Sequence, residues 1–181
     1  MSAVIRLDAV LHEAVATPYC DLVTRPAGAA VRNRVLAVLR DTADDAAQLD
    51  FSAVGLMDYS CADEVVAKLL VAMLDGVAPR LILRGVRDHH ADAINHALAR
   101  YDLVVVALLV DLPRPSLLGS PPDDWRDAFD ALVSLGRAAA GSVADALAWP
   151  LPRTTAALEG LARGRCVVAY PDSTFALGAV A

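Results

Sequence analysis

The stretch around Ser60 carries residue types suited to chemistry at a helix N-terminus. An apolar run ends at Met57, an acidic turn follows at Asp58, and Ser60 stands where helical spacing begins. The helix expected from Cys61 has one apolar face, formed by Val65, Val66, Leu69, Leu70, Met73 and Leu74. Because the first N–H groups of a helix lack partners within it, they favour an incoming anion. The pattern therefore predicts a switch or contact site at Ser60, with Asp58 and Tyr59 beside it.

Ser60 also has a simpler interpretation as a helix cap. Serine is a preferred N-cap residue, worth about 1 kcal/mol. Ser60 with Asp63 resembles a capping box that has Asp in place of Glu or Gln. A phosphate on Ser60 would carry roughly two negative charges, which Asp58, Asp63 and Glu64 would repel. The sequence thus predicts a cap, keeps a regulatory contact as the alternative, and disfavours a phosphorylation switch.

Residues 50–54 and 58–61 resemble the core of a STAS domain, the fold of anti-sigma-factor antagonists and of sulfate-transporter tails. In that family a strand of the type Asp-Phe/Leu-Ser-x-Val precedes a helix that opens with Asp-Ser-Ser-Gly. Here the strand is Asp-Phe-Ser-Ala-Val and the helix opens with Asp-Tyr-Ser-Cys. By this alignment Ser60 occupies the position of the serine that is phosphorylated in the antagonists, while Tyr59 replaces the first serine and Cys61 the glycine.

These replacements, followed by Ala62-Asp63-Glu64, are closer to the STAS-like family of unknown function. The resemblance covers residues 1–112. It implies an α/β domain that acts in regulation by binding a partner protein.

No local motif for catalysis or for a cofactor is found. The chain lacks a Gly-x-Gly-x-x-Gly loop, a Walker loop, a Gly-x-Ser-x-Gly turn and a His-Glu-x-x-His helix. Asp88, His89, Asp92 and His96 could share one helix face, and the spacing of His89 and Asp92 occurs in metal sites of helix bundles. A solvated polar face explains them equally well. We therefore predict neither an enzyme nor a bound metal or cofactor.

Composition restricts the class of protein. Of the 181 residues, 56% are hydrophobic, and the mean hydropathy is +0.45. No uncharged apolar run approaches the roughly 18 residues of a membrane span, and no signal-peptide pattern opens the chain. Cys20, Cys61 and Cys166 form no Cys-x-x-Cys pair. We expect a cytoplasmic protein with no membrane partner.

The charge balance argues against a broad phosphate-binding surface. The net charge is −6, and Lys68 is the one lysine among sixteen basic residues. A group of arginines near the first predicted helix is interpreted as ordinary surface charge: Arg25, Arg32, Arg34 and Arg40.

Strand and helix patterns alternate over residues 1–112. Strands are predicted at residues 5–11, 21–24, 47–54, 80–85 and 103–110. Helices are predicted after Gly28, from Cys61 to Asp75 with Gly76 ending it, and after a cap at Asp88. Such alternation predicts right-handed crossovers and helices packed on a central sheet, an α/β fold.

A proline-rich stretch separates this part from the tail. Residues 113–122 contain Pro113, Pro115, Pro121 and Pro122. Because proline removes backbone donors and restricts the residue before it, this stretch is predicted to be an extended linker between domains 1–112 and 123–181.

The tail has the element order of a different fold. Helices are predicted over residues 123–135, 143–148 with a cap at Ser142, and 153–163, followed by a hairpin around residues 171–174. Three helices followed by a hairpin resemble a winged helix-turn-helix, and residues 139–147 resemble the second helix of bacterial regulators. The resemblance implies DNA contacts from the third helix and its end, namely Arg153, Thr154, Thr155, Arg163 and Arg165.

Charge leaves the role of this predicted winged helix open. Residues 120–181 hold five arginines and seven acidic residues, a net charge of −2, so a monomer would bind DNA weakly. The preferred hypothesis is a regulator, related to transcription, in which the STAS-like domain binds a protein partner and the winged helix passes the signal on, with DNA contacted by a homodimer. The alternative is a protein-interaction scaffold that never contacts nucleic acid. A basic surface around Arg153, Arg163 and Arg165 would favour the first, and an apolar or acidic one the second.

Overall fold

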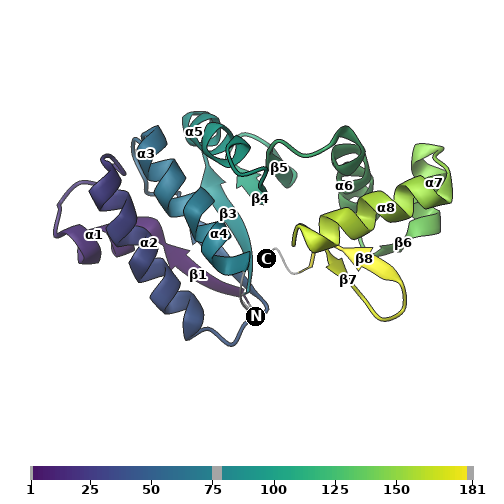
Figure 1. Ribbon diagram of the computed structural model, residues 1–181, viewed down its shortest axis with the longest axis horizontal. Coiled ribbons are helices and arrows are strands. Elements are labelled where there is room, and N and C mark those ends of the chain that lie inside the picture. The colour runs from purple at the N-terminus through teal and green to yellow at the C-terminus, as the bar shows by residue number, and fades with distance from the viewer. Residues whose placement is uncertain (1, 75–78, 179–181) are drawn as a thin grey trace.

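The structure, a computed structural model, describes residues 2–74 and 79–178 (Figure 1). The first part of the chain forms β1 (Ser2–Arg6), α1 (Leu7–Val15), α2 (Arg25–Arg40), β2 (Ala46–Asp50), α3 (Tyr59–Ala62), the π-helical turn η1 (Asp63–Ala67), α4 (Lys68–Leu74), β3 (Arg80–Val86), α5 (Asp88–Ala99), β4 (Val104–Leu109) and β5 (Ser116–Gly119). The rest forms α6 (Asp123–Leu135), β6 (Ala138–Ala139), α7 (Ala140–Leu147), α8 (Leu151–Arg163), β7 (Val168–Ala169) and β8 (Thr174–Ala176).

A mostly parallel sheet organises the first part of the chain. Its strands lie in the order β1-β2-β3-β4-β5, and all neighbours are parallel except the last pair. Consecutive parallel strands joined by crossovers of one hand place their helices on one face of the sheet. Leu49 and Leu83 point to that face, where they share a core with Val35, Val65 and Ile94 of the helices. The predicted α/β class is confirmed.

The last three helices and a small sheet form a second unit. β6, β8 and β7 are antiparallel neighbours in that order, and α6, α7 and α8 pack around Phe129, Leu132 and Leu158. The same core includes Ile82 and Val106, which lie on the sheet face opposite to the helices. The second unit therefore packs directly against the far side of the main sheet, near β3, β4 and β5.

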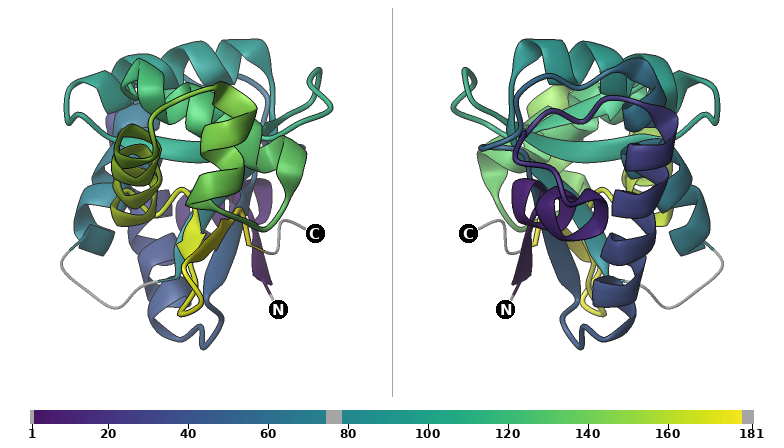
Figure 2. Two further views of the ribbon diagram at one scale, coloured as in Figure 1. Left: turned by 90° about the vertical axis from the view of Figure 1, so that its right-hand side faces the viewer. Right: turned by 90° about the vertical axis from the view of Figure 1, so that its left-hand side faces the viewer.

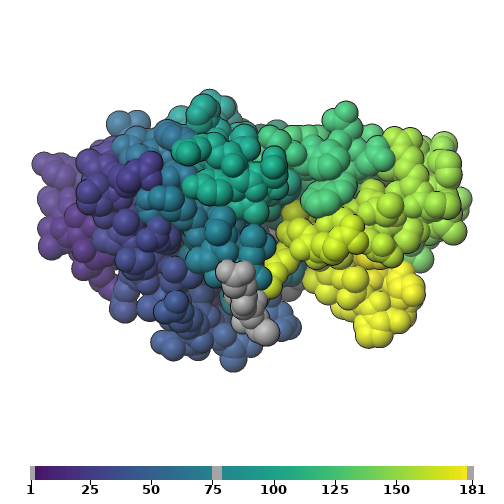
Figure 3. Space-filling model, viewed as in Figure 1, coloured from purple at the N-terminus to yellow at the C-terminus, as the bar shows by residue number. Residues whose placement is uncertain are grey.

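The figures show how the two units are arranged. They lie side by side along the long axis, with α1 and α2 at one end and α7 at the other, while α8 reaches back toward the middle (Figure 1). Figure 2 looks along this axis from each end, with the second unit in front on the left and α1 and α2 in front on the right. The space-filling view shows two lobes in contact near the middle of the molecule (Figure 3).

Several predicted boundaries differ from the structure. The strand predicted over residues 5–11 ends at Arg6, because Leu7, Val10 and Leu11 have helical spacing and are buried on one side of α1. The strand predicted at 21–24 is a single parallel bridge, Leu22 with Met57. Helix α5 begins at Asp88 itself, and Arg87 is the residue that precedes it.

Boundaries in the second unit can be compared in the same way. Helix α6 spans the predicted residues and ends before Gly136. Helix α7 begins at Ala140, so Ser142 lies inside it and does not cap it. The predicted helix end at Asp75 and Gly76 lies outside the described residues.

The proline-rich stretch contributes a strand to the sheet. Residues 116–119 form β5, antiparallel to β4, with Leu118 opposite Val105. Leu117 is buried in the core of the second unit and Leu118 in the core of the first. The segment predicted as a linker thus carries alternating side chains into both cores.

Candidate functional site at the start of helix α3

Asp58 ties the start of α3 to a distant loop. One carboxylate oxygen, Oδ1, accepts the backbone N–H of Cys61 at 2.7 Å and the Ser60 hydroxyl at 2.8 Å. The other, Oδ2, accepts the backbone N–H of Thr24 at 2.9 Å. Burial opposes ionisation of this carboxyl group, but the hydrogen bonds from Thr24, Cys61 and Ser60 outweigh it and lower the pKa of Asp58.

The prediction that Ser60 caps the helix is wrong. Asp58 is the N-cap, and the helix has already begun at Tyr59, so Ser60 lies within its first turn. The Ser60 hydroxyl donates to Asp58 and does not accept a helix N–H. The predicted capping box with Asp63 is absent for the same reason: the Asp63 carboxylate is turned toward Arg25 and Tyr101.

Two buried carboxylates follow this helix start in the π-helical turn η1. The side chains of Asp63 and Glu64 are only 2% and 4% exposed. Arg25 of α2 bridges them, with its Nη1 atom 2.8 Å from Asp63 Oδ2 and 2.7 Å from Glu64 Oε1. Arg32 and Lys68 also pair with Glu64, and the Tyr101 hydroxyl donates to Asp63 at 3.0 Å. Three cations thus cover two buried carboxylates.

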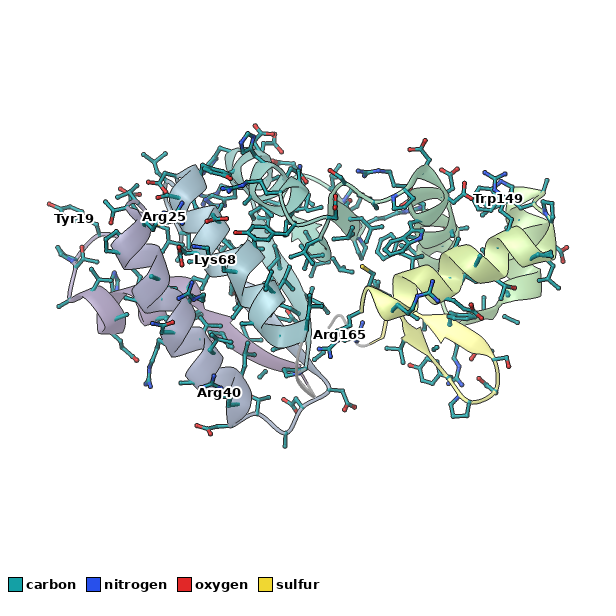
Figure 4. The ribbon with its side chains drawn as sticks, in the orientation of Figure 1. Tyr19, Arg25, Arg40, Lys68, Trp149 and Arg165 are labelled. Atoms are coloured by element: carbon teal, nitrogen blue, oxygen red, sulfur yellow. The ribbon has the colours of Figure 1, made fainter. Side chains whose placement is uncertain are left out.

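This cluster is electrostatically satisfied. Burial by itself would raise the pKa of both carboxyl groups. Hydrogen bonds from Arg25 and Tyr101 outweigh burial at Asp63, and those from Lys68 and Arg25 outweigh it at Glu64, so each pKa lies below its ordinary value. Arg25 and Arg32 are therefore structural partners of the acidic pair, and their interpretation as ordinary surface charge is wrong. Figure 4 shows Arg25 and Lys68 close together over the helices.

The loop before α2 is held in a strained conformation. Thr24 has φ 76° and ψ 135°, a backbone conformation that a β-branched residue rarely adopts. Its carbonyl oxygen accepts the Cys61 thiol at 3.0 Å. Close packing continues at Gly28, where an added Cβ atom would lie 3.1 Å from the Cys61 Cα. Backbone strain and π-helical turns are both frequent at functional sites.

Apolar side chains are exposed beside this anchored loop. Residues 20–22 lie alongside residues 55–58, joined by the hydrogen bonds Leu22 N–H to Leu56 O at 2.8 Å and Gly55 N–H to Cys20 O at 3.0 Å. Tyr19, Val23 and Leu56 are 70%, 41% and 64% exposed. We call the surface formed by Tyr19, Val23, Leu56, Tyr59 and Ser60 the α3 surface.

Tyr59 extends the α3 surface toward α5. Its hydroxyl accepts a hydrogen bond from Arg100 Nη1 at 2.9 Å, and its ring meets His96 edge-on with centroids 4.6 Å apart. Two residues at the C-terminal end of α5, His96 and Arg100, therefore hold Tyr59 in place.

The groups that could do chemistry near this surface are engaged elsewhere. Burial raises the pKa of the Cys61 thiol to about 12, with Asp58 adding to the effect, so the thiolate nucleophile is suppressed. His89 and His90 both direct Nε2 toward the Gly55 carbonyl, at 3.2 and 2.7 Å. Within the described residues, no group of three or more His, Cys, Asp or Glu side chains could hold a metal ion.

The residues predicted to contact DNA do not form one surface. Arg153 pairs with Asp124 at 2.6 Å and stacks on Trp149. Thr154 is 0% exposed and donates to the Pro150 carbonyl, so it must be removed from the predicted contacts. Arg165 lies at the far end of α8, between the two units (Figure 4).

Thr155 and Arg163 instead line a groove between α8 and the hairpin. The groove has a volume of about 640 Å³. Leu151, Tyr170 and Phe175 supply apolar walls, and Glu159 adds a negative charge. Arg137 lies over the Tyr170 ring and pairs with Asp172. The face is mixed in charge and largely apolar.

Comparison with known proteins gives no relative. No family model matches the chain, and neither the curated proteins nor the solved structures contain a significant match. No helix among the described residues is long and apolar enough to cross a membrane.

Proposed function

We propose that this protein is a regulator that binds a partner protein through the α3 surface. The observation that carries the proposal is the exposure of Tyr19, Val23 and Leu56 on loops held by Asp58. Exposed apolar side chains grouped on a rigid support are typical of protein interaction sites. A site on an ordered loop loses less conformational entropy on binding than one on a mobile loop.

A STAS-like fold for residues 1–112 is part of this proposal. It is supported by the parallel sheet and by the helix that follows β2 and opens at Asp58-Tyr59-Ser60. In the antagonists that the motif resembles, this helix start is the site of regulation. The same position in this chain, Ser60, belongs to the α3 surface.

The proposed regulation at Ser60 is a contact and not a phosphorylation switch. The Ser60 hydroxyl already donates to Asp58 at 2.8 Å, and the carboxylate beside it would repel a phosphate. A partner that approaches Ser60 would meet the Tyr59 ring and the apolar side chains of the α3 surface. This contact fits an apolar protein surface better than an anionic ligand.

A winged-helix fold for the second unit is the other part of the proposal. The element order α6-β6-α7-α8-β7-β8, with β8 between β6 and β7, supports it. Its close packing on the main sheet through Ile82, Val106 and Leu117 gives a route by which partner binding at one unit could affect the other.

DNA is a second candidate ligand, supported by that element order. The groove that Thr155 and Arg163 line is largely apolar and mixed in charge, which favours the scaffold instead. With a net charge of −2 over residues 120–181, a single copy can neutralise few phosphates, so we propose that DNA binding requires a homodimer. Light scattering combined with fluorescence anisotropy on genomic fragments at low salt tests this. Specific binding by a strict monomer would refute the dimer requirement, and no binding at any salt would favour the scaffold.

Partner capture with matched surface variants tests the main proposal. The full chain, Leu56→Asp and the control Leu112→Asp would each be used to isolate partners from the native cells. Leu112 is 50% exposed and lies away from the α3 surface, so both substitutions place a charge on an exposed leucine. We expect Leu56→Asp to lose the partner and Leu112→Asp to keep it. Equal retention by both variants would exclude the α3 surface.

A further inference from the structure

A cavity lies between the two units, away from the α3 surface. Its volume is about 100 Å³. From the first part of the chain it is lined by α4 and by the starts of β3 and β4, and from the second unit by α6 and the end of α8. Most of the lining is apolar, and two charged residues, Asp102 and Arg165, also border the cavity. The apolar residues include Leu70, Met73, Leu81, Leu103, Val105 and Trp125.

Packing within the second unit fixes the position of the Trp125 side chain. Its ring packs on Gly160 and Gly164 of the α8 end, and a Cβ atom added at Gly160 would lie 2.6 Å from the ring. Only a residue without a side chain therefore leaves room for the indole at this position. The glycines let Trp125 reach the cavity and form its wall on the side of the second unit.

The size and lining of the cavity determine the ligand class. Apolar cavities of roughly 150 Å³ in proteins stay dry and accept benzene or xenon, so about 100 Å³ with an opening suits a single small ring. A tryptophan ring and a methionine thioether both make favourable contacts with an aromatic ligand.

We propose that this cavity binds a small apolar molecule of about one aromatic ring. The ligand contacts Met73 and Leu103 from the first unit and Trp125 from the second. Because it touches both units, its binding stabilises their packed arrangement relative to any state in which they separate. The site lies outside the α3 surface, so this proposal does not rest on partner binding there.

Methionine methyl NMR tests the proposal, with benzene as the probe. Met73 lines the cavity, whereas Met57 is buried beside the α3 surface and serves as an internal control. We expect benzene to produce a saturable shift of the Met73 methyl signal and to leave Met57 unchanged. Absence of a saturable Met73 shift up to the solubility limit of benzene, or an equal shift at Met57, would overturn the proposal.

Cavity-filling variants give the specificity control. Leu70→Phe and Leu103→Phe each place a ring in the cavity and are expected to weaken benzene binding at least tenfold, while Leu112→Phe, outside the cavity, retains it. The Met57 signal reports whether each variant is folded. One folded filling variant, Leu70→Phe or Leu103→Phe, is enough to test the site. Unchanged benzene affinity in a folded filling variant would place the ligand elsewhere and refute the site.

Discussion

The carboxylate of Asp58 accepts the backbone N–H of Thr24 at 2.9 Å, across 34 residues of chain. This bond joins the loop before α2 to the first turn of α3. The same carboxylate caps α3 through Cys61, so one side chain holds both the Thr24 loop and the start of α3.

Substitutions at Asp58 and Ser60 should show which of the two residues caps α3. Asp58→Ala removes three hydrogen bonds to a partly buried carboxylate and is expected to lower the free energy of unfolding by about 2 kcal/mol or more. Ser60→Ala removes only a donor to Asp58 and should cost less than about 1 kcal/mol. Urea unfolding measures both. A larger loss for Ser60→Ala would mean that Ser60 is the cap after all.

Thr24→Gly should relieve backbone strain. A non-glycine residue at φ 76°, ψ 135° costs about 1–3 kcal/mol, and the Thr24 side chain is exposed, so its removal uncovers no core. We therefore expect the free energy of unfolding to be unchanged or to rise by about 1 kcal/mol, after the greater flexibility of unfolded glycine is included. Thr24→Ala, which keeps the strain, is the matched control. If Thr24→Gly were less stable than Thr24→Ala in thermal unfolding, the claim that the Thr24 backbone is strained would be wrong.

The packing of α2 on α3 should depend on Gly28. An added Cβ atom would lie 3.1 Å from both the Cys61 Cα and the Glu64 Cβ, and such overpacking typically costs about 1–3 kcal/mol. Gly28 lies within α2, so alanine also gains up to about 1 kcal/mol of helix stability there, and we expect the overpacking to outweigh this gain. Gly141→Ala in helix α7 is the control, since nothing lies within 4 Å of its added Cβ and alanine should stabilise that helix by up to about 1 kcal/mol. Chemical denaturation of the two variants should therefore give opposite signs, and a stabilising Gly28→Ala would refute the close contact.

Acid should destabilise the protein through the buried carboxylates. The ordinary pKa values of Asp63 and Glu64 are 3.8 and 4.5, and their folded-state values are lower. The folded state therefore binds protons less readily than the unfolded state, so the stabilisation is complete above about pH 5 and is lost as the pH falls through the folded pKa values. Unfolding measured from pH 6 to pH 3 should show this decline.

Two variants test whether the loss of stability in acid comes from Asp63, Glu64 and their cationic partners. Glu64→Gln should lower stability at neutral pH, because it removes the charge shared by Arg25, Arg32 and Lys68, and should also flatten the pH dependence. Glu13→Gln breaks the exposed pair with Arg34 and should keep the wild-type slope. An unaltered slope in Glu64→Gln would mean that other groups control the acid response.

Local sequence patterns predicted those helices and strands whose ends are set by residues at the ends themselves, such as a helix-starting Asp or a helix-ending Gly. Helix α6 begins at Asp123 and stops before Gly136, as the sequence predicts, and the hairpin of β7 and β8 lies where two apolar runs flank a turn. The boundary at Leu7 was missed because a short run of apolar residues fits a strand and a helix equally well.

The candidate site depends on partners that no local pattern identifies. Asp58 replaces Ser60 as the cap because it can also reach Thr24, and that contact exists only after the loop has folded back. The role of Arg25 likewise comes from α2 packing on η1, which brings it to Asp63 from 38 residues away. The one sequence signal was the pair Asp63-Glu64 in a mostly apolar helical segment with Lys68 one turn later, since buried acids require cationic partners.

Site-specific photo-crosslinking in the native cells tests the central claim most directly. A photoreactive residue at Leu56, in the α3 surface, is compared with one at Leu112, outside it, in the full chain. The account predicts a discrete protein adduct from Leu56 that is lost when Asp58→Ala releases the Thr24 loop, and no such adduct from Leu112. The same adducts from both positions, or none from Leu56, would contradict a partner-binding α3 surface.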